Sequence, residues 1–301
     1  MEQRMSALTW GLLALLGLIW GGSFFFARIA VAEVPPLTLV FLRLSIAALA
    51  LHIYIAGRFG IYPLLKRRWR EFLILGILNN ALPHALIFFG QTRIGAGLAS
   101  ILNATTPIWT VLIANYLTSD EKLSSAKIIG CLTGLLGTVV LVGPSITSSH
   151  DQPLWALLLP VIAAVSYGFA ATYGKRFKGV VPPVIAAGQM TASSLVALPL
   201  SLIIDRPWAI AMPSIDSIAA ILAIAVLSTA FGYILYFRIM AAAGATNTSL
   251  VTLLVPPSAI LLGFLFLGER LEMTDIAGMA LIGAGLVILD GRLYRRSRAI
   301  A

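Results

Sequence analysis

The apolar residues of this chain gather in long runs, and most polar and charged residues occupy the short stretches between them. A run of about 17 to 25 apolar residues can cross the hydrocarbon core of a bilayer as an α-helix. The predicted spans are residues 8–27, 36–56, 72–92, 96–117, 125–142, 153–173, 184–203, 217–237, 245–267 and 274–290. The gaps carry turn signals such as Pro35-Pro36, Gly143-Pro144 and Pro182-Pro183. The pattern therefore predicts an all-α membrane protein with ten transmembrane helices.

The Lys and Arg residues favour one side of this arrangement. Sixteen of the 21 lie in segments that share a side with the N-terminus, four lie on the opposite side, and Arg43 lies within a span. Cytoplasmic loops of membrane proteins carry an excess of Lys and Arg. We therefore expect both the N- and the C-terminus to be cytoplasmic.

An internal repeat becomes visible when the chain is shifted by 147 or 148 positions. Matching pairs are Trp20 with Tyr167, Pro35-Pro36 with Pro182-Pro183, Glu121 with Glu269, and Gly137 with Gly285. Because each half holds five spans, an odd number, the second half should insert upside down. We expect two inverted five-helix repeats, at 1–143 and 151–291, followed by a basic cytoplasmic tail at 292–301. Inverted repeats are typical of transporters with a binding site near the bilayer midplane.

Composition supports a membrane protein and argues against other classes. The chain is 59% apolar and 11% charged, with a mean hydropathy of +0.95, whereas soluble domains are about a quarter charged. The net charge of +9 could suggest nucleic-acid binding, but the basic residues lie between apolar segments, so we expect no nucleic-acid partner. Cys131 is the only cysteine, which rules out a disulfide within the chain. The first apolar run, of about 20 residues, exceeds a usual signal-peptide core and is taken as a retained helix.

Two consecutive predicted spans each carry a polar stripe along one helical face. The stripes are Asn80, His84, Phe88 and Gln91, and then Ser100, Asn103, Pro107 and Thr110. Spacings of three and four residues place side chains on one face of a helix. Since polar groups are costly in hydrocarbon, such stripes face a bundle interior or a watery cavity. We interpret this pair as the wall of a substrate path.

The repeat extends the candidate lining into the second half. The candidate substrate-binding residues are Trp20, Asn80, His84, Phe88, Asn103, Trp109, Tyr167, Tyr233, Tyr236 and Ser249. Candidate gating or helix-kink residues are Pro83, Pro107 and Pro256, because proline interrupts helical hydrogen bonding. An aromatic lining with a few hydroxyls and amides suits a partly apolar, hydrogen-bonding small molecule. For Trp109 the alternative is a packing or lipid-facing role.

Two residues leave a functional and a structural interpretation open. His84 is a substrate contact or proton-sensitive gate, or else a neutral histidine in a hydrogen bond between helices. Arg43 lies about 10 Å inside the second span and either attracts a substrate carboxylate or bonds backbone carbonyls and snorkels outward. Neither interpretation of His84 involves a metal, since it has no partner at metal-ligand spacing.

The motifs of several other mechanisms are absent from the sequence. All twelve Asp and Glu residues lie in tails, loops or span ends, which argues against a mid-membrane carboxylate proton relay. There is no GxxxxGK[ST] loop for ATP and no catalytic set within the spans. We therefore predict no catalytic residues, no metal and no cofactor, with transport by facilitated diffusion or dependent on His84.

Several motifs together resemble a known superfamily. They are Trp20-Gly21-Gly22-Ser23-Phe24, Pro35-Pro36 before the span with Arg43, the runs Pro107 to Glu121 and Pro257 to Glu269, and the glycine-spaced last span of each half. The chain is similar to the drug/metabolite transporter superfamily, in particular its ten-helix EamA-type exporters. The resemblance implies a central cavity between inverted repeats and export of small metabolites across a bacterial inner membrane. Within this group the chain looks like the aromatic amino-acid exporters.

The leading hypothesis is an exporter of aromatic and other neutral amino acids that works by alternating access. Its expected partners are this small-molecule substrate and the lipid bilayer, while the oligomeric state stays open and a monomer is compatible. The alternatives are a drug or other metabolite exporter of the same fold and, from another class, a lipid flippase or intramembrane enzyme.

Overall fold

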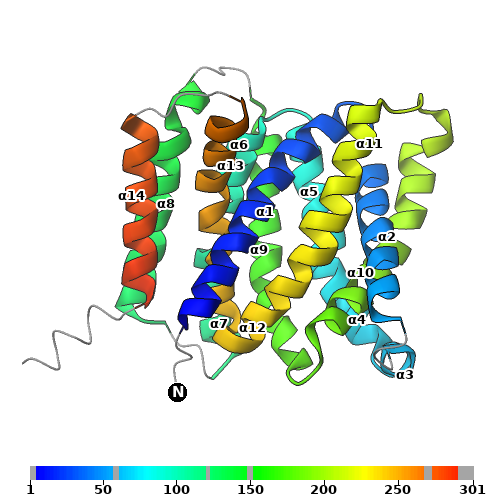
Figure 1. Ribbon diagram of the computed structural model, residues 1–301, viewed down its shortest axis with the longest axis horizontal. Coiled ribbons are helices and arrows are strands. Elements are labelled where there is room, and N and C mark those ends of the chain that lie inside the picture. Colours follow the sequence, from blue (N-terminus) through cyan, green and yellow to red (C-terminus); the bar gives the residue numbers. More distant parts are fainter. Residues whose placement is uncertain (1–4, 57–60, 120–122, 148–151, 268–272, 291–301) are drawn as a thin grey trace, which may run out of the picture.

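The computed structural model of the chain describes residues 5–56, 61–119, 123–147, 152–267 and 273–290, and within them the protein is helical with no strand (Figure 1). The first half contains α1 (Ala7–Val31), α2 (Pro36–Ile55), α3 (Ile61–Arg67), α4 (Trp69–Gly76), η1 (Ile77–Ala81), α5 (Leu82–Gln91), α6 (Ala96–Asn103), α7 (Thr106–Leu117) and α8 (Ser125–Thr147). The second half contains α9 (Leu154–Gly174), η2 (Lys175–Phe177), α10 (Pro182–Leu200), η3 (Ser201–Asp205), η4 (Pro207–Ala209), α11 (Ile215–Leu222), η5 (Ala223–Phe231), α12 (Gly232–Ser249), α13 (Val251–Leu267) and α14 (Met273–Asp290). The predicted tail at 292–301 lies outside the described residues.

Seven helical runs in the described residues are long and apolar enough to cross a membrane. Consecutive elements form some of these runs, such as Trp69–Gln91, which combines α4, η1 and α5. Two shorter apolar helices, Ser125–Val140 and Ile276–Leu289, coincide with the predicted fifth and tenth spans. The all-α, multi-pass membrane character predicted from the apolar runs is therefore confirmed.

Local sequence signals explain where several helices begin. The Ser6 hydroxyl accepts a hydrogen bond from the Thr9 N–H at 3.1 Å and caps α1. Pro36 and Pro182 occupy the first positions of α2 and α10, where the missing N–H has no helical partner. The duplicated Pro-Pro pairs thus start equivalent helices in the two halves.

The breaks between spans differ from the predicted ones in detail. The eighth span continues to residue 243, six residues beyond the prediction, and ends at Gly244, whose φ of 80° and ψ of 174° interrupt α12. Helix α13 passes through Pro256, and the chain is interrupted earlier, at Leu250. The fourth span is likewise broken, between α6 and α7. The fourth and ninth predicted spans are therefore each interrupted by only one or two residues, which keep right-handed helical backbone angles.

The third and eighth spans both contain a π-helical segment, at equivalent positions of the repeat. These are η1 and η5. In η1 the carbonyl of Leu78 accepts a hydrogen bond from the Ser166 hydroxyl of α9 at 2.7 Å. In η5 the carbonyl of Ser228 accepts one from the Trp20 indole of α1 at 2.9 Å. The first helix of each half is therefore bound to the π segment of the other half.

Equivalent helices of the two halves run antiparallel where they meet. In the α8–α14 pair, side by side at one edge of Figure 1, Gly130 lies against Gly285 and Gly137 lies against Gly278. In the α2–α10 pair, Thr38 Oγ1 and Ser201 Oγ are 2.9 Å apart near one end. At the other end His52 Nε2 and Thr191 Oγ1 are also 2.9 Å apart. As residue numbers rise along one helix, they fall along its partner.

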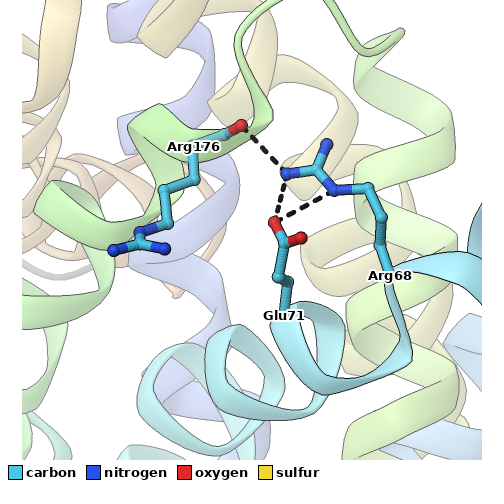
Figure 2. A network of polar contacts seen from close by, with 3 residues as sticks. All are labelled: Arg68, Glu71 and Arg176. Atoms are coloured by element: carbon cyan, nitrogen blue, oxygen red, sulfur yellow. Dashed lines mark hydrogen bonds and ion pairs between the residues drawn. The ribbon is translucent and has the colours of Figure 1, made fainter.

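Contacts at the two ends of the bundle join the halves further. At one end Glu33, between α1 and α2, accepts hydrogen bonds from the Ser214 N–H at 2.6 Å and from its hydroxyl at 2.7 Å. At the other end Arg68 forms an ion pair with Glu71 and donates to the carbonyl of Arg176 at 3.0 Å (Figure 2). Each contact joins loops that the sequence predicts on one side of the membrane.

Candidate functional site

A cavity of about 730 Å³, including its mouth, lies where the two halves meet. Twenty residues line it: Trp20, Ser23, Phe24, Ala27, Arg43, Asn79, His84, Ile87, Phe88, Gln91, Asn103, Thr106, Tyr167, Ala171, Tyr233, Tyr236, Ser249, Val251, Thr252 and Val255. The wall combines α1, α2, the third span and the α6–α7 break with α9, α12 and α13.

One side of the cavity is an aromatic cluster held by the π segments. The Trp20 ring stacks on Tyr236 with centroids 5.8 Å apart and tilts against Tyr233 at 5.7 Å. The Tyr233 hydroxyl donates to the carbonyl of Asn79, in η1, at 2.9 Å. Gly232 leaves room for the indole, because a Cβ there would lie 2.8 Å from Trp20 Nε1. These rings are fixed in place and offer flat apolar surface to a ligand.

Another part of the wall has buried polar atoms without partners. Gln91 Oε1, Asn103 Oδ1 and His84 Nδ1 have no hydrogen-bond partner among the described residues. The other end of Gln91 is fixed, since its Nε2 donates to the carbonyl of Phe24 at 3.1 Å. A buried polar atom without a partner costs free energy comparable to a lost hydrogen bond. This part of the wall is therefore suited to donors from a bound molecule.

The hydroxyls near the α6–α7 and α12–α13 breaks are already engaged as donors. Thr106 donates to the Asn103 carbonyl at 2.6 Å, and Ser249 donates to the Thr246 carbonyl at 2.7 Å. Thr252 in turn donates to the Ser249 carbonyl at 2.8 Å. A hydroxyl oxygen that donates once still has free lone pairs. These groups therefore add acceptors to the cavity wall.

Arg43 is the only Lys, Arg, Asp or Glu among the lining residues. Its side chain is 7% exposed, its Nε donates to Thr229 Oγ1 at 2.7 Å, and its guanidinium carbon lies 5.9 Å from the centre of the Phe88 ring. Among the described residues no carboxylate forms an ion pair with Arg43. The cavity therefore has a positive electrostatic character.

The structure brings together most of the site residues predicted from sequence. Those that line the cavity are Trp20, His84, Phe88, Asn103, Tyr167, Tyr233, Tyr236 and Ser249. Asn80 does not line it: its side chain is fully buried, and the neighbouring Asn79 is in the wall instead. Trp109 is half-buried outside the wall, with its indole N–H donating to Thr105 Oγ1 at 3.3 Å.

Two of the three predicted kink prolines lie directly after a helix interruption. Pro83 is the second residue of α5, directly after η1, and Pro107 is the second residue of α7, directly after the fourth-span break. Pro256 lies inside α13, six residues after Leu250.

His84 has no hydrogen bond to another described residue, and its ring stacks on Phe88 with centroids 6.2 Å apart. The structure shows no hydrogen-bond partner for His84 Nδ1 among the described residues.

Sequence reasoning did not place Asn79, Thr106 and Thr252 at the site, and it left Arg43 undecided. Asn79 and Asn80 are adjacent, and nothing local tells which of them faces inward. The two threonines adjoin predicted positions and could have been found by extending the stripes by one turn.

Within the described residues no group of three His, Cys, Asp or Glu side chains could hold a metal ion.

Comparisons with known proteins agree with this architecture. Over 284 residues, 93% of this chain and 95% of the relative, it is 25% identical to the uncharacterized transporter YoaV of Bacillus subtilis. It is 25% identical to a probable terminal-alkyne amino-acid exporter of Streptantibioticus cattleyicolor, over 98% of this chain and 97% of that protein. An uncharacterized inner membrane transporter of Escherichia coli, YedA, is 26% identical over 93% of this chain and 89% of its own.

A solved crystal structure shares the fold, with a TM-score of 0.77 at 20% identity over 95% of this chain and 97% of that one. The EamA-like transporter family matches this chain twice, at residues 7–143 and 154–289. The two matches cover both halves of the internal repeat. The chain therefore belongs to the EamA-like transporter family and is a membrane transporter.

Proposed function

We propose that the protein exports aromatic and other neutral amino acids from the cytoplasm of a bacterium across its inner membrane. The observation that carries this proposal is the cavity between the halves, whose wall contains both an aromatic cluster and buried polar atoms without partners. A neutral amino acid needs both surfaces, because its side chain is apolar while its ammonium group requires acceptors. The similarity to a probable amino-acid exporter supports the same substrate class.

Transport follows alternating access between two inverted halves. Ten membrane spans form two five-helix repeats, with both termini in the cytoplasm. The antiparallel α2–α10 and α8–α14 pairs support this inversion, because equivalent helices can run antiparallel only if one repeat is turned over. Rocking of one half against the other would open the cavity to each side in turn.

Within the cavity the amino acid has a defined orientation. Its side chain packs against Trp20, Tyr233 and Tyr236, and its ammonium group donates to Gln91, Asn103 and neutral His84. Tyr167 and Phe88 complete the apolar wall, and Ser249 adds an acceptor. Since no lining residue is acidic, coupling to a carboxylate proton relay is not part of the mechanism.

The test is counterflow of labelled phenylalanine in liposomes that contain the purified protein. Tyr236→Ala removes a ring that stacks on Trp20, and we expect phenylalanine transport to fall by about tenfold, as for a loss of roughly 1.4 kcal/mol. Tyr116→Ala is the matched control, because Tyr116 is 83% exposed and outside the cavity. The proposal fails if no aromatic amino acid shows protein-dependent flux. Transport of bulky amines instead would identify a drug exporter, and lipid movement a flippase.

A further inference from the structure

Arg43 stands out in the cavity because its charge is uncompensated. Arginine keeps its positive charge in proteins, and a buried charge without a counter-ion is strongly unfavourable. One of its five N–H groups is used by Thr229, and no described residue accepts from the other four. The Phe88 ring at 5.9 Å gives only a weak cation–π contact. The missing counter-charge must therefore come from what the cavity holds.

The geometry of a guanidinium limits which anion fits best. Its paired N–H groups match the two oxygens of a carboxylate in a bidentate contact. The aromatic and aliphatic wall around Arg43, with Phe88 and Ile87 from the same cavity, favours an organic anion over a strongly hydrated inorganic one. The acceptors Gln91 and Asn103 belong to the same wall but are not charged, so they complement an ammonium without competing with the carboxylate for Arg43.

We propose that Arg43 binds the carboxylate of the transported molecule and makes the cavity selective for carboxylates over amines of the same shape. This inference rests on the proposed function, since it concerns the same cavity. It adds a specificity-determining residue and extends the substrate class to aromatic carboxylic acids that lack an amino group.

A purely structural role for Arg43 makes a different prediction. In that case Arg43 acts only through its hydrogen bond to Thr229, which joins α2 to η5, and the charge of a ligand does not affect its binding affinity. Thr229→Val removes that bond while the guanidinium remains, so it separates the two roles. Arg93→Gln is a second control, because Arg93 is exposed and outside the cavity.

The experiment measures equilibrium binding of four compounds to the purified full chain. Phenylalanine and 3-phenylpropanoate carry a carboxylate, whereas phenylalaninamide and phenethylamine do not. We expect the wild type, Thr229→Val and Arg93→Gln to bind the two carboxylates at least about tenfold more tightly than the two amines. Arg43→Gln should reduce this preference to within about twofold, and Arg43→Lys should keep part of it.

The outcomes separate this inference from the proposed function. Binding of 3-phenylpropanoate through Arg43, without flux of any amino acid, keeps the inference and rejects amino-acid export. Flux of phenylalanine and phenylalaninamide at equal rates keeps export and overturns the inference. Equal binding of all four compounds, binding of none, or binding of chloride alone also overturns it. If Arg43→Gln does not fold, the wild-type and Arg43→Lys preferences decide the question.

Discussion

Two acidic side chains at one end of the helical bundle accept hydrogen bonds from backbone N–H groups of the opposite half. Asp205, at the end of η3, accepts a hydrogen bond from the Thr38 N–H in the first turn of α2 at 2.6 Å. Glu33 accepts two hydrogen bonds from Ser214, which caps α11. A helix N-terminus favours negative charge, because its first N–H groups lack helical partners. Asp205 and Glu33, which the sequence predicts in loops or at span ends, thus connect the two halves at one end of the bundle.

Glu33 makes the stability of this end depend on pH. The hydrogen bonds from the Ser214 N–H and hydroxyl lower the pKa of Glu33 from its ordinary value of 4.5. A carboxyl whose pKa is lowered by folding stabilises the protein above its unfolded pKa, and this stabilisation disappears as pH falls through the folded pKa. We expect Glu33→Gln to lower the melting temperature at pH 7 and to have little effect near pH 3. Equal effects of Glu33→Gln at the two pH values would contradict this.

The α8–α14 pair shows how single residues set the distance between two elements. A Cβ on Gly285 would lie 2.6 Å from the Gly134 nitrogen and 2.7 Å from the Gly130 carbonyl oxygen. Small residues let helix backbones approach closely in a membrane. Gly130, Gly134, Gly137 and Gly285 all lie at such a close approach, whereas Gly283 does not. A Cβ on Gly283 would meet no atom within 4 Å, because this position points away from the α8 backbone.

This difference allows a matched pair of substitutions in one helix. Gly285→Ala must push α14 away from α8, and we expect it to lower the free energy of unfolding by about 1–3 kcal/mol. Gly283→Ala meets no atom and removes backbone freedom, so it should be neutral or stabilise by up to about 1 kcal/mol. Unfolding of both variants by SDS titration in one detergent measures the difference. Similar effects of the two alanines would show that close approach is not what limits this interface.

On the scale of the whole molecule, the first helix of each half packs against the π segment of the other half. Helix α1 contacts η5, and α9 contacts η1, through the Trp20 and Ser166 hydrogen bonds. At the two opposite ends of the bundle, separate contacts connect the loops, one at Glu33 and one at Arg68 (Figure 2). If the halves rock as we propose, the motion has to loosen one of these end contacts while the other is kept.

The orientation in the membrane is testable with single cysteines. Cys131 is only 3% exposed, so the wild type supplies the unlabelled background. Met212, 88% exposed, lies in a loop predicted outside, and the exposed Lys178 lies in a loop predicted inside. In intact cells a membrane-impermeant maleimide should label Met212→Cys and leave Lys178→Cys unlabelled until the cells are permeabilised. The reverse pattern would place both termini outside.

Much of the fold was predictable because its signals are local or repeated. Apolar run length shows which segments are long enough for a membrane, and the Pro-Pro pairs mark where equivalent helices begin. The aromatic residues of the site were also accessible, since Trp20 and Tyr167 match in the repeat. The predicted end of the eighth span was wrong by six residues, because the helix continues past the charged Arg238 and ends only at the backbone of Gly244.

The sequence by itself determined the helical membrane class, the duplication and the residue types available to the cavity, because hydrophobic length and repetition do not depend on distant contacts. Tertiary structure decided which of those residues face the cavity. Asn79, in the π segment η1, lines the wall whereas Asn80 does not, and Trp109 lies outside the wall. Only the packing of α2 against η5 shows Arg43 donating to Thr229, with no carboxylate partner among the described residues. Such choices depend on partner helices far away in the chain, which no local pattern records.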